Sequence, residues 1–197
     1  MRIKENWEWI HSWCEDTNNT DKPRVLLVGD SITHNYQEMV RENLKDVCYV
    51  DYVSTAYSID TPIYKALVRE FIKDSNYALV HFNNGLHGID IPKRSYRVHI
   101  KKVLDYIPKS TKTTLALSTC VKREGNRRWD TKWMKRVKER NEVMQEIAEE
   151  RGLQVDDLFS VSMNIPLKDR YVDGTHYEVS GYKILADAVT EFIKNNL

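Results

Sequence analysis

The sequence predicts an α/β protein in which helices cover both faces of a parallel sheet. Short runs rich in Val, Leu and aromatic residues alternate with longer segments whose apolar residues recur at the helical period. No repeat, low-complexity tract or Gly/Ser-rich linker interrupts this alternation, so we expect residues 1–197 to form a single domain. A domain of this size buries roughly 70% of the surface of its unfolded chain in one core.

Five short apolar runs are predicted to be strands: 24–28, 47–53, 77–82, 113–118 and 153–156. Five longer segments between and after them are predicted to be helices: 32–44, 62–73, 93–107, 131–151 and 179–195. Pro23 marks the entry to the first strand, and Gly152 is a helix-stop signal after the fourth helix.

Residues 1–20 are predicted to form a helical extension packed on the domain. Trp7, Ile10, Trp13 and Cys14 are spaced like one face of a short helix. We interpret these tryptophans as core residues in preference to a ligand-stacking surface.

Composition excludes several classes of partner. The chain has 30 basic and 29 acidic residues and a formal charge of +1, so no global field favours nucleic acid or an anionic membrane. No segment is apolar enough for a membrane span or a signal peptide. Cys14, Cys48 and Cys120 are widely spaced, which disfavours disulfides and zinc. We therefore expect a cytoplasmic protein.

Three segments that are able to carry chemistry follow predicted strands. Residues 29–31 follow the first strand, 83–88 the third and 120–129 the fourth. Ligands bind open parallel sheets beyond the carboxyl ends of the strands. The three segments are therefore expected to meet in one crevice.

Gly29-Asp30-Ser31 would by itself be an ordinary turn and helix cap. A serine in the first turn of a helix, however, also lies where backbone N–H groups and the helix dipole stabilise an oxyanion. Asp30 is expected to contact substrate beside it.

Asp173-Gly174-Thr175-His176 precedes the last predicted helix. A three-residue spacing within a turn lets the carboxylate reach Nδ1 of the imidazole while Nε2 faces a hydroxyl, and Gly174 keeps the turn tight. A capping Asp beside a surface His is an equally good explanation of this pair alone, but it does not account for the serine. The three residues together fit the roles of a serine hydrolase, with Ser31 as the nucleophile, His176 as the general base and Asp173 as the acid that orients the base.

The loop 83–88 is rich in hydrogen-bond donors, since it contains Asn83, Asn84 and His87 together with two glycines. Donors placed beside a developing oxyanion are worth about 2.7–4 kcal/mol each in the transition state. An Asn/Gly turn that satisfies its own backbone is the alternative. We favour the donor role because the loop lies at the predicted crevice.

The loop 120–129 places Arg127 and Trp129 at the rim of the crevice, where arginine suits anions and tryptophan suits a sugar face. A solvated loop is the ordinary interpretation of such a segment. We interpret Cys120 as a buried thiol. His34 lies three residues after Ser31 and is expected either to line the pocket or to compete with His176 as the base. The remaining histidines lack metal-ligand spacing, and no nucleotide-binding glycine motif is present, so neither metal nor organic cofactor is expected.

The segment 25–33 (Val-Leu-Leu-Val-Gly-Asp-Ser-Ile-Thr), with Asp173-x-x-His176 and Gly181, resembles the GDSL, or SGNH, hydrolases. The resemblance covers the chain from Arg24 to Leu197. It implies a flavodoxin-like three-layer sandwich with five parallel strands in the order 2-1-3-4-5. It also implies that Ser31 is the nucleophile and that Asp173 and His176 complete the triad.

Two blocks depart from the family pattern. The usual glycine of the second block is absent, and the N–H of Ala56 is the nearest candidate for its oxyanion role. In the third block His87 occupies the position of the usual Asn, with Asn84 as an alternative donor. The Asn-Asn-Gly-Leu-His run resembles a bacterial subset of the family, so we treat the change as a variant.

The sequence thus predicts a serine esterase that cleaves a short acyl ester, with a lean toward O-acetyl groups on a carbohydrate. The oxyanion would be held by the N–H of Ser31 with donors from Ala56, Asn84 or His87. Acyl transfer through the same triad and a non-catalytic carbohydrate-binding module are the alternatives. The expected binding partner is the substrate, a small-molecule or carbohydrate ester. The sequence is compatible with either a monomer or a homodimer.

Overall fold

A six-stranded sheet runs through the middle of the protein in the computed structural model, which describes residues 6–122 and 127–197. The strands are β1 (Ile10–Trp13), β2 (Arg24–Gly29), β3 (Tyr49–Thr55), β4 (Leu79–Phe82), β5 (Lys112–Ala116) and β6 (Gln154–Asp156). Their order across the sheet is β1-β3-β2-β4-β5-β6. The five strands from β2 to β6 are parallel to one another, and β1 pairs antiparallel with β3.

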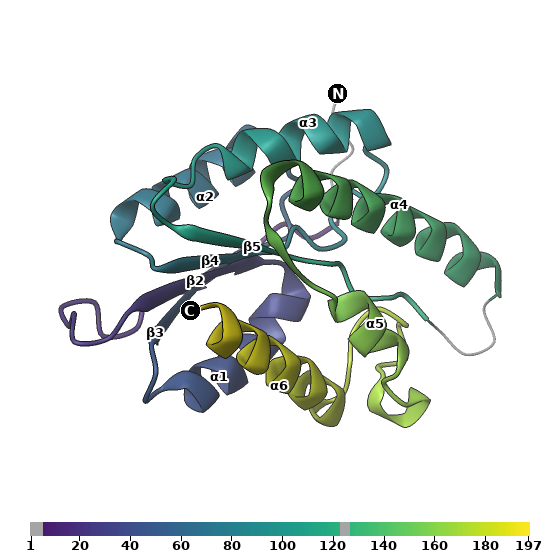
Figure 1. The fold of residues 1–197 in the computed structure, drawn as a ribbon. Helices are drawn as coiled ribbons and strands as arrows, with labels where there is room; N and C mark the ends of the chain where they lie inside the picture. Colours follow the sequence, from purple (N-terminus) through teal and green to yellow (C-terminus); the bar gives the residue numbers. More distant parts are fainter. Residues whose placement is uncertain (1–5, 123–126) are drawn as a thin grey trace.

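Helices form the outer two layers (Figure 1). They are α1 (Ser31–Leu44), α2 (Pro62–Asp74), α3 (Lys93–Leu104), α4 (Arg127–Arg151), α5 (Leu158–Met163) and α6 (Val179–Asn196), with a 3₁₀ turn at Leu167–Asp169. Helices α2, α3 and α4 cover one face of the sheet, and α1 and α6 cover the other (Figure 1).

The side chains of β2 point alternately to the two faces of the sheet, and they contribute to a separate hydrophobic core on each face. Leu26 and Val28 belong to the cluster under α2, α3 and α4, whereas Val25 and Leu27 belong to the cluster under α1 and α6. Successive side chains of a strand point to opposite faces, so a central strand with helices on both sides needs a continuous apolar run. All four residues are at most 1% exposed.

The expected architecture is confirmed, with one strand more than predicted. The five predicted strands correspond to β2, β3, β4, β5 and β6, and their spatial order is the flavodoxin-like order expected from the resemblance. Helix α5 and the 3₁₀ turn were not predicted, because they are too short to show a helical period.

The helical prediction for residues 1–20 is wrong in the described residues. Residues 10–13 form the edge strand β1, with Ile10 opposite Thr55 and Trp13 opposite Tyr52. Trp7 is 83% exposed and Trp13 is 55% exposed, so neither is a core residue. Pairing with the β3 backbone overrides a short helix-like spacing, which alone cannot distinguish the two conformations.

A buried ion pair anchors the N-terminal segment at the amino end of the sheet. Nη1 of Arg24 lies 2.7 Å from Oδ1 of Asp51, and both residues are buried. The same guanidinium donates to the backbone carbonyls of residues 15, 16 and 19. This anchor lies at the opposite end of β2 from Ser31.

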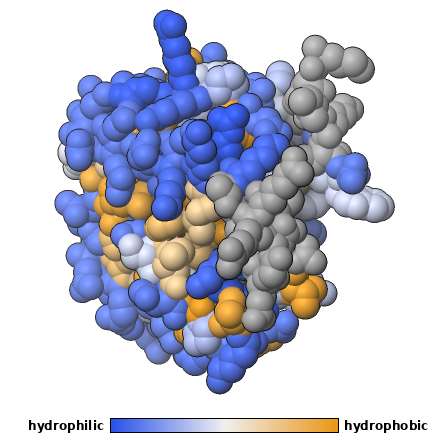
Figure 2. Space-filling model, turned by 90° about the vertical axis from the view of Figure 1, so that its right-hand side faces the viewer, coloured by the Kyte–Doolittle hydropathy of each residue, from blue (hydrophilic) through white to orange (hydrophobic). Residues whose placement is uncertain are grey.

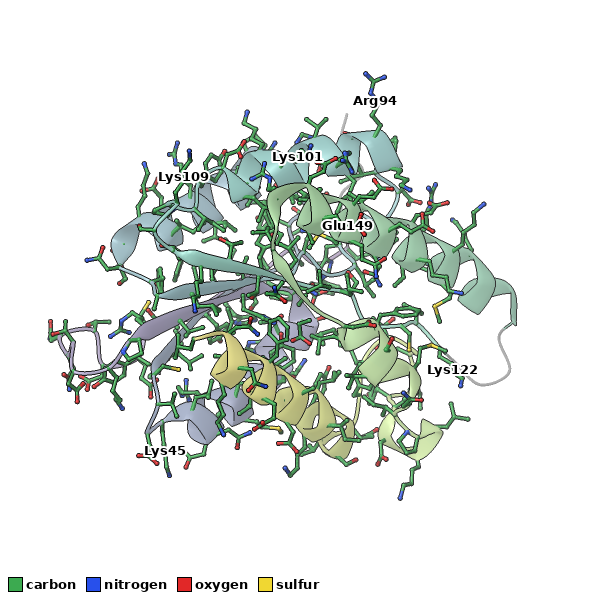
Figure 3. All side chains as sticks on the ribbon, in the orientation of Figure 1. Lys45, Arg94, Lys101, Lys109, Lys122 and Glu149 are labelled. Carbon is green, nitrogen blue, oxygen red and sulfur yellow. The ribbon has the colours of Figure 1, made fainter. Side chains whose placement is uncertain are left out.

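The outer helix surfaces are charged (Figure 3), with Lys101 on α3 and Glu149 on α4 among the labelled side chains. Ion pairs join these two helices, including Arg97 with Glu146 at 2.6 Å and Lys93 with Glu142 at 2.9 Å. Such exposed pairs contribute little individually to stability. Within the described part of the chain, none of the helices has the length and apolar character needed to cross a membrane.

Candidate active site

Ser31 is the first residue of α1, at the carboxyl end of β2. Asp30 caps the helix by accepting the Ile32 N–H at 2.9 Å. The strand and the cap together place the Ser31 hydroxyl at the positive end of the helix dipole. Ser31 therefore lies where the sequence predicts it.

His176 and Asp173 lie next to Ser31 in a single hydrogen-bonded chain. Nε2 of His176 is 2.8 Å from Oγ of Ser31, and Nδ1 is 2.6 Å from Oδ2 of Asp173. The other carboxylate oxygen accepts the backbone N–H groups of Thr175 and His176 at 2.8 and 2.9 Å. Residues 145 positions apart in the sequence thus form a serine, imidazole and carboxylate relay.

Asp173 is held in its ionised form. Partial burial raises the pKa of its carboxyl group, but hydrogen bonds from the backbone and ring of His176 and from Thr175 outweigh this effect and lower the pKa. Gly174 has a φ of 76°, which allows the tight turn between Asp173 and His176.

Asp30 joins the serine turn to the third loop. While Oδ1 caps α1, Oδ2 accepts the Leu86 N–H at 3.0 Å. The residue lines the cavity described below but is only 2% exposed, and backbone amides occupy both its oxygens. Asp30 therefore has a structural role that positions the loop relative to Ser31, and its contact with substrate stays a prediction.

Gly85 allows this close approach, because a Cβ built on it would lie 1.8 Å from Oδ2 of Asp30 and its φ is +63°. We expect Gly85→Ala to lower the free energy of unfolding by about 2–4 kcal/mol, from backbone strain plus the clash. Gly152→Ala is the matched control, since Gly152 has a φ of +65° and nothing within 4 Å of its added Cβ. Urea unfolding of both variants checks this, and equal losses would contradict the role of the Asp30 contact.

The three residues expected to join the Ser31 N–H as oxyanion donors occupy different environments. His87 lines the same cavity as Ser31. Asn84 is 3% exposed and is not among the described residues that line this cavity. Ala56 does line the cavity, but its N–H donates to the Trp9 carbonyl at 3.2 Å, so the expected donor is occupied in this structure. Trp9 belongs to the N-terminal segment whose strand conformation was not predicted.

A cavity of about 770 Å³ opens beside Ser31 and His176. Figure 2 views the molecule from the end at which the strands finish and shows hydrophobic residues exposed within a hydrophilic surface. Apolar and acidic residues share the described lining. The apolar ones include Trp7, Trp9, Leu86, Ile89, Ile91 and Trp133, and the acidic ones are Glu8, Asp30, Asp60 and Asp90.

Sequence reasoning named other residues for this rim. The side chains of Arg127 and Trp129 lie outside the described part of the structure. Trp7, Trp9 and Trp133 are cavity-lining aromatics that it missed, and Trp7 had been interpreted as a core residue. Trp133 could have been found from its position, because it lies at the start of the predicted helix 131–151, next to the loop 120–129. Nothing in the sequence indicated that Trp9 lines the cavity, because residues 1–20 were interpreted as a helix packed on the domain.

Two further candidates from the sequence have other partners in the structure. Nδ1 of His34 lies 3.2 Å from the Tyr52 hydroxyl, and its ring stacks on His11 with centroids 4.3 Å apart. Burial lowers the pKa of His34, with a smaller contribution from His11.

Cys120 is fully buried, and Arg170 donates to its sulfur at 3.3 Å. In residues 6–122 and 127–197, no cluster of three or more His, Cys, Asp or Glu is arranged to hold a metal ion.

Comparisons with known proteins identify the fold. No family model matches the sequence, and no curated protein matches it. The structure is similar to the acetylxylan esterase Axe2 from Geobacillus stearothermophilus, with a TM-score of 0.72 and 18% identity over 87% of this chain and 94% of that one. It is also similar to a member of the lipolytic G-D-S-L family from Veillonella parvula, with a TM-score of 0.70 and 15% identity over 87% and 98% of the two chains.

A lipase/acylhydrolase from Enterococcus faecalis has a TM-score of 0.67 and 18% identity, with 89% of this chain and 97% of that chain covered. The fold is thus the α/β/α sandwich of these solved structures, and the chain spans nearly their full length. Within that fold, the serine, imidazole and carboxylate relay lies at the carboxyl end of the parallel strands.

Proposed function

We propose that this protein is a serine esterase that cleaves a short acyl ester through Ser31, His176 and Asp173. The observation that carries the proposal is the relay in which His176 bridges Ser31 Oγ at 2.8 Å and Asp173 Oδ2 at 2.6 Å. Both distances allow hydrogen bonds, and the order of the groups is that of a general-base-activated nucleophile.

In the proposed reaction, Ser31 Oγ attacks the ester carbonyl while His176 Nε2 takes the hydroxyl proton. The tetrahedral intermediate collapses as His176 returns that proton to the departing alcohol, leaving an acyl-enzyme on Ser31. Water then attacks the acyl-enzyme, again with His176 as base, and releases the carboxylic acid and free Ser31. Asp173 holds the imidazole with its Nδ1 proton and stabilises the imidazolium.

The oxyanion of both intermediates is assigned to two donors. The N–H of Ser31 lies in the first turn of α1, and His87 lines the same cavity as Ser31. Ala56 could contribute its N–H only if the bond to the Trp9 carbonyl opened.

The cavity lining supports an acetylated sugar as substrate. Trp7, Trp9 and Trp133 offer aromatic faces, which suit the apolar faces of sugar rings. Carboxylates in the same lining accept hydrogen bonds from hydroxyl groups. Two of the similar structures are of a single protein, Axe2, which is named an acetylxylan esterase in one and, as a mutant, an acetyl-xylooligosaccharide esterase in the other. We therefore place O-acetyl groups on a carbohydrate first among candidate substrates.

Hydrolysis of p-nitrophenyl esters from acetate to octanoate, together with acetylated xylo-oligosaccharides, tests the proposal. We expect turnover that falls with acyl length, and a fluorophosphonate probe that labels Ser31 as read by peptide mass spectrometry. Ester products formed only when an acceptor alcohol is added would assign acyl transfer instead. Sugar binding with neither turnover nor labelling would assign a non-catalytic module.

A further inference from the structure

Arg140 is a buried charged residue on the inner face of α4. It is 4% exposed, and its guanidinium lies 4.6 Å from the centre of the Tyr96 ring. Nη1 donates to the carbonyls of Gly85 and His87 at 3.0 and 3.1 Å, and Nη2 donates to those of His87 at 3.2 Å and Gly88. A single side chain thus binds three carbonyls within four consecutive residues.

The loop that Arg140 binds is also held from two other directions. Asp30 accepts the Leu86 N–H at 3.0 Å and caps the helix that begins with Ser31. On a third side, Ser118 Oγ donates to the Gly85 carbonyl at 3.2 Å. Every one of these contacts holds the loop backbone. His87 lines the cavity beside Ser31, as do Leu86 and Gly88, and of these three it has the side chain that can donate a hydrogen bond.

We propose that Arg140 is the positioning residue for His87. It fixes the backbone on both sides of that histidine, so that its ring is preorganised to donate to the oxyanion formed on attack by Ser31. The inference rests on the proposed esterase function. Preorganised donors lower the barrier because no reorganisation is needed when charge develops, and displacement of a donor by about 1 Å costs on the order of 10²-fold in rate.

The geometry requires a guanidinium and not merely a positive charge. The planar fork of Arg140 divides its bonds between two nitrogens and spans the carbonyls of residues 85, 87 and 88. A lysine ammonium is a compact point donor on a flexible stem and cannot reproduce this spread. Arg140→Lys therefore retains the charge while it releases the loop.

The test is a double-mutant cycle on acetyl-ester hydrolysis with four proteins: the parent, Arg140→Lys, His87→Ala, and the double variant. In the parent background, we expect Arg140→Lys to lower kcat at least about tenfold with KM little changed, because only the transition-state interaction is weakened. In the His87→Ala background, the same substitution is expected to lower kcat less than about twofold.

Arg24→Lys is the matched control, because Arg24 is also buried and also donates to three backbone carbonyls, at the far end of β2. It is expected to lower Tm while it leaves kcat unchanged. If Arg140→Lys lowers kcat by the same factor with and without His87, or leaves kcat of the parent unchanged, the positioning role is overturned.

Arg140→Gln replaces Arg140→Lys in the cycle if the lysine variant does not fold. Failure of both variants to fold would assign Arg140 to stability alone and overturn the inference. An inactive parent whose Ser31 resists the fluorophosphonate probe is a different result, since it overturns the proposed function and, with it, the inference.

Discussion

Ser31→Ala is expected to lower kcat/KM for acetyl esters by about 10⁴-fold or more. In the proposed reaction the hydroxyl oxygen of Ser31 forms the acyl-enzyme, and it is the group that His176 and Asp173 are arranged to activate. Residual hydrolysis would come from water oriented by the oxyanion donors. Initial rates with p-nitrophenyl acetate measure the effect.

The fold should tolerate this substitution, because Ser31 is only partly buried and alanine is a good helix former at the start of α1. Circular dichroism and Tm check this. Ser160→Ala is the matched control, since that serine is exposed, lies on α5 and donates its hydroxyl to Asp157. Activity of Ser31→Ala within tenfold of the parent would show that another nucleophile acts.

The parts of the site that could be predicted share one property. Ser31 follows an apolar strand, and Asp173 and His176 are three residues apart, so each is marked by its local sequence. In a parallel sheet, the carboxyl ends of the strands converge on one edge, which supplies the long-range information that local patterns lack. The relay across 145 residues could therefore be predicted from the amino-acid sequence alone.

Arg140 could not be recognised in the same way, although a signal existed. It lies in a run dense in charge, where most arginines and lysines are solvated. It is also spaced by three from Val137 and by four from Met144, both of which are buried, and so falls on the apolar stripe of its helix. A charge on such a stripe indicates a buried partner, but not which loop supplies it.

The N-terminal segment shows the opposite failure. Ile10 and Trp13 are separated by the spacing of one helical turn, and nothing local reveals that an edge of β3 is available for pairing. Because Trp9 directly precedes β1, its carbonyl reaches the Ala56 N–H at 3.2 Å. One wrong secondary-structure prediction thus hid both the aromatic lining of the cavity and the fate of a candidate oxyanion donor.

Asp173→Asn is expected to lower kcat by about 10⁴-fold, the loss typical of a triad acid replaced by its amide. Asn can still accept the Thr175 and His176 amides through its oxygen, so the turn persists. Its NH₂ group would then face Nδ1 of His176, which must accept that bond and carry its proton on Nε2. An imidazole in that tautomer cannot take the proton of Ser31.

Stability against pH separates this local role from a folding defect. Hydrogen bonds lower the pKa of Asp173 in the folded protein despite the opposing effect of burial. The carboxylate therefore stabilises the fold fully above its unfolded pKa, and this contribution disappears as pH falls through the lower folded pKa. We expect the parent to have a modestly higher Tm than Asp173→Asn at neutral pH, and the two Tm values to converge in strong acid.

Retained kcat in Asp173→Asn would contradict the assignment and point to another base, with His34 the nearest histidine in sequence to Ser31. In the structure, however, His34 is bonded to Tyr52 and stacked on His11, with a lowered pKa. His34→Gln in the Asp173→Asn background decides whether His34 or His176 is the base. If His34 acts as the base, its replacement removes the remaining activity. A rate that is low in Asp173→Asn and unaffected by His34→Gln assigns the base to His176.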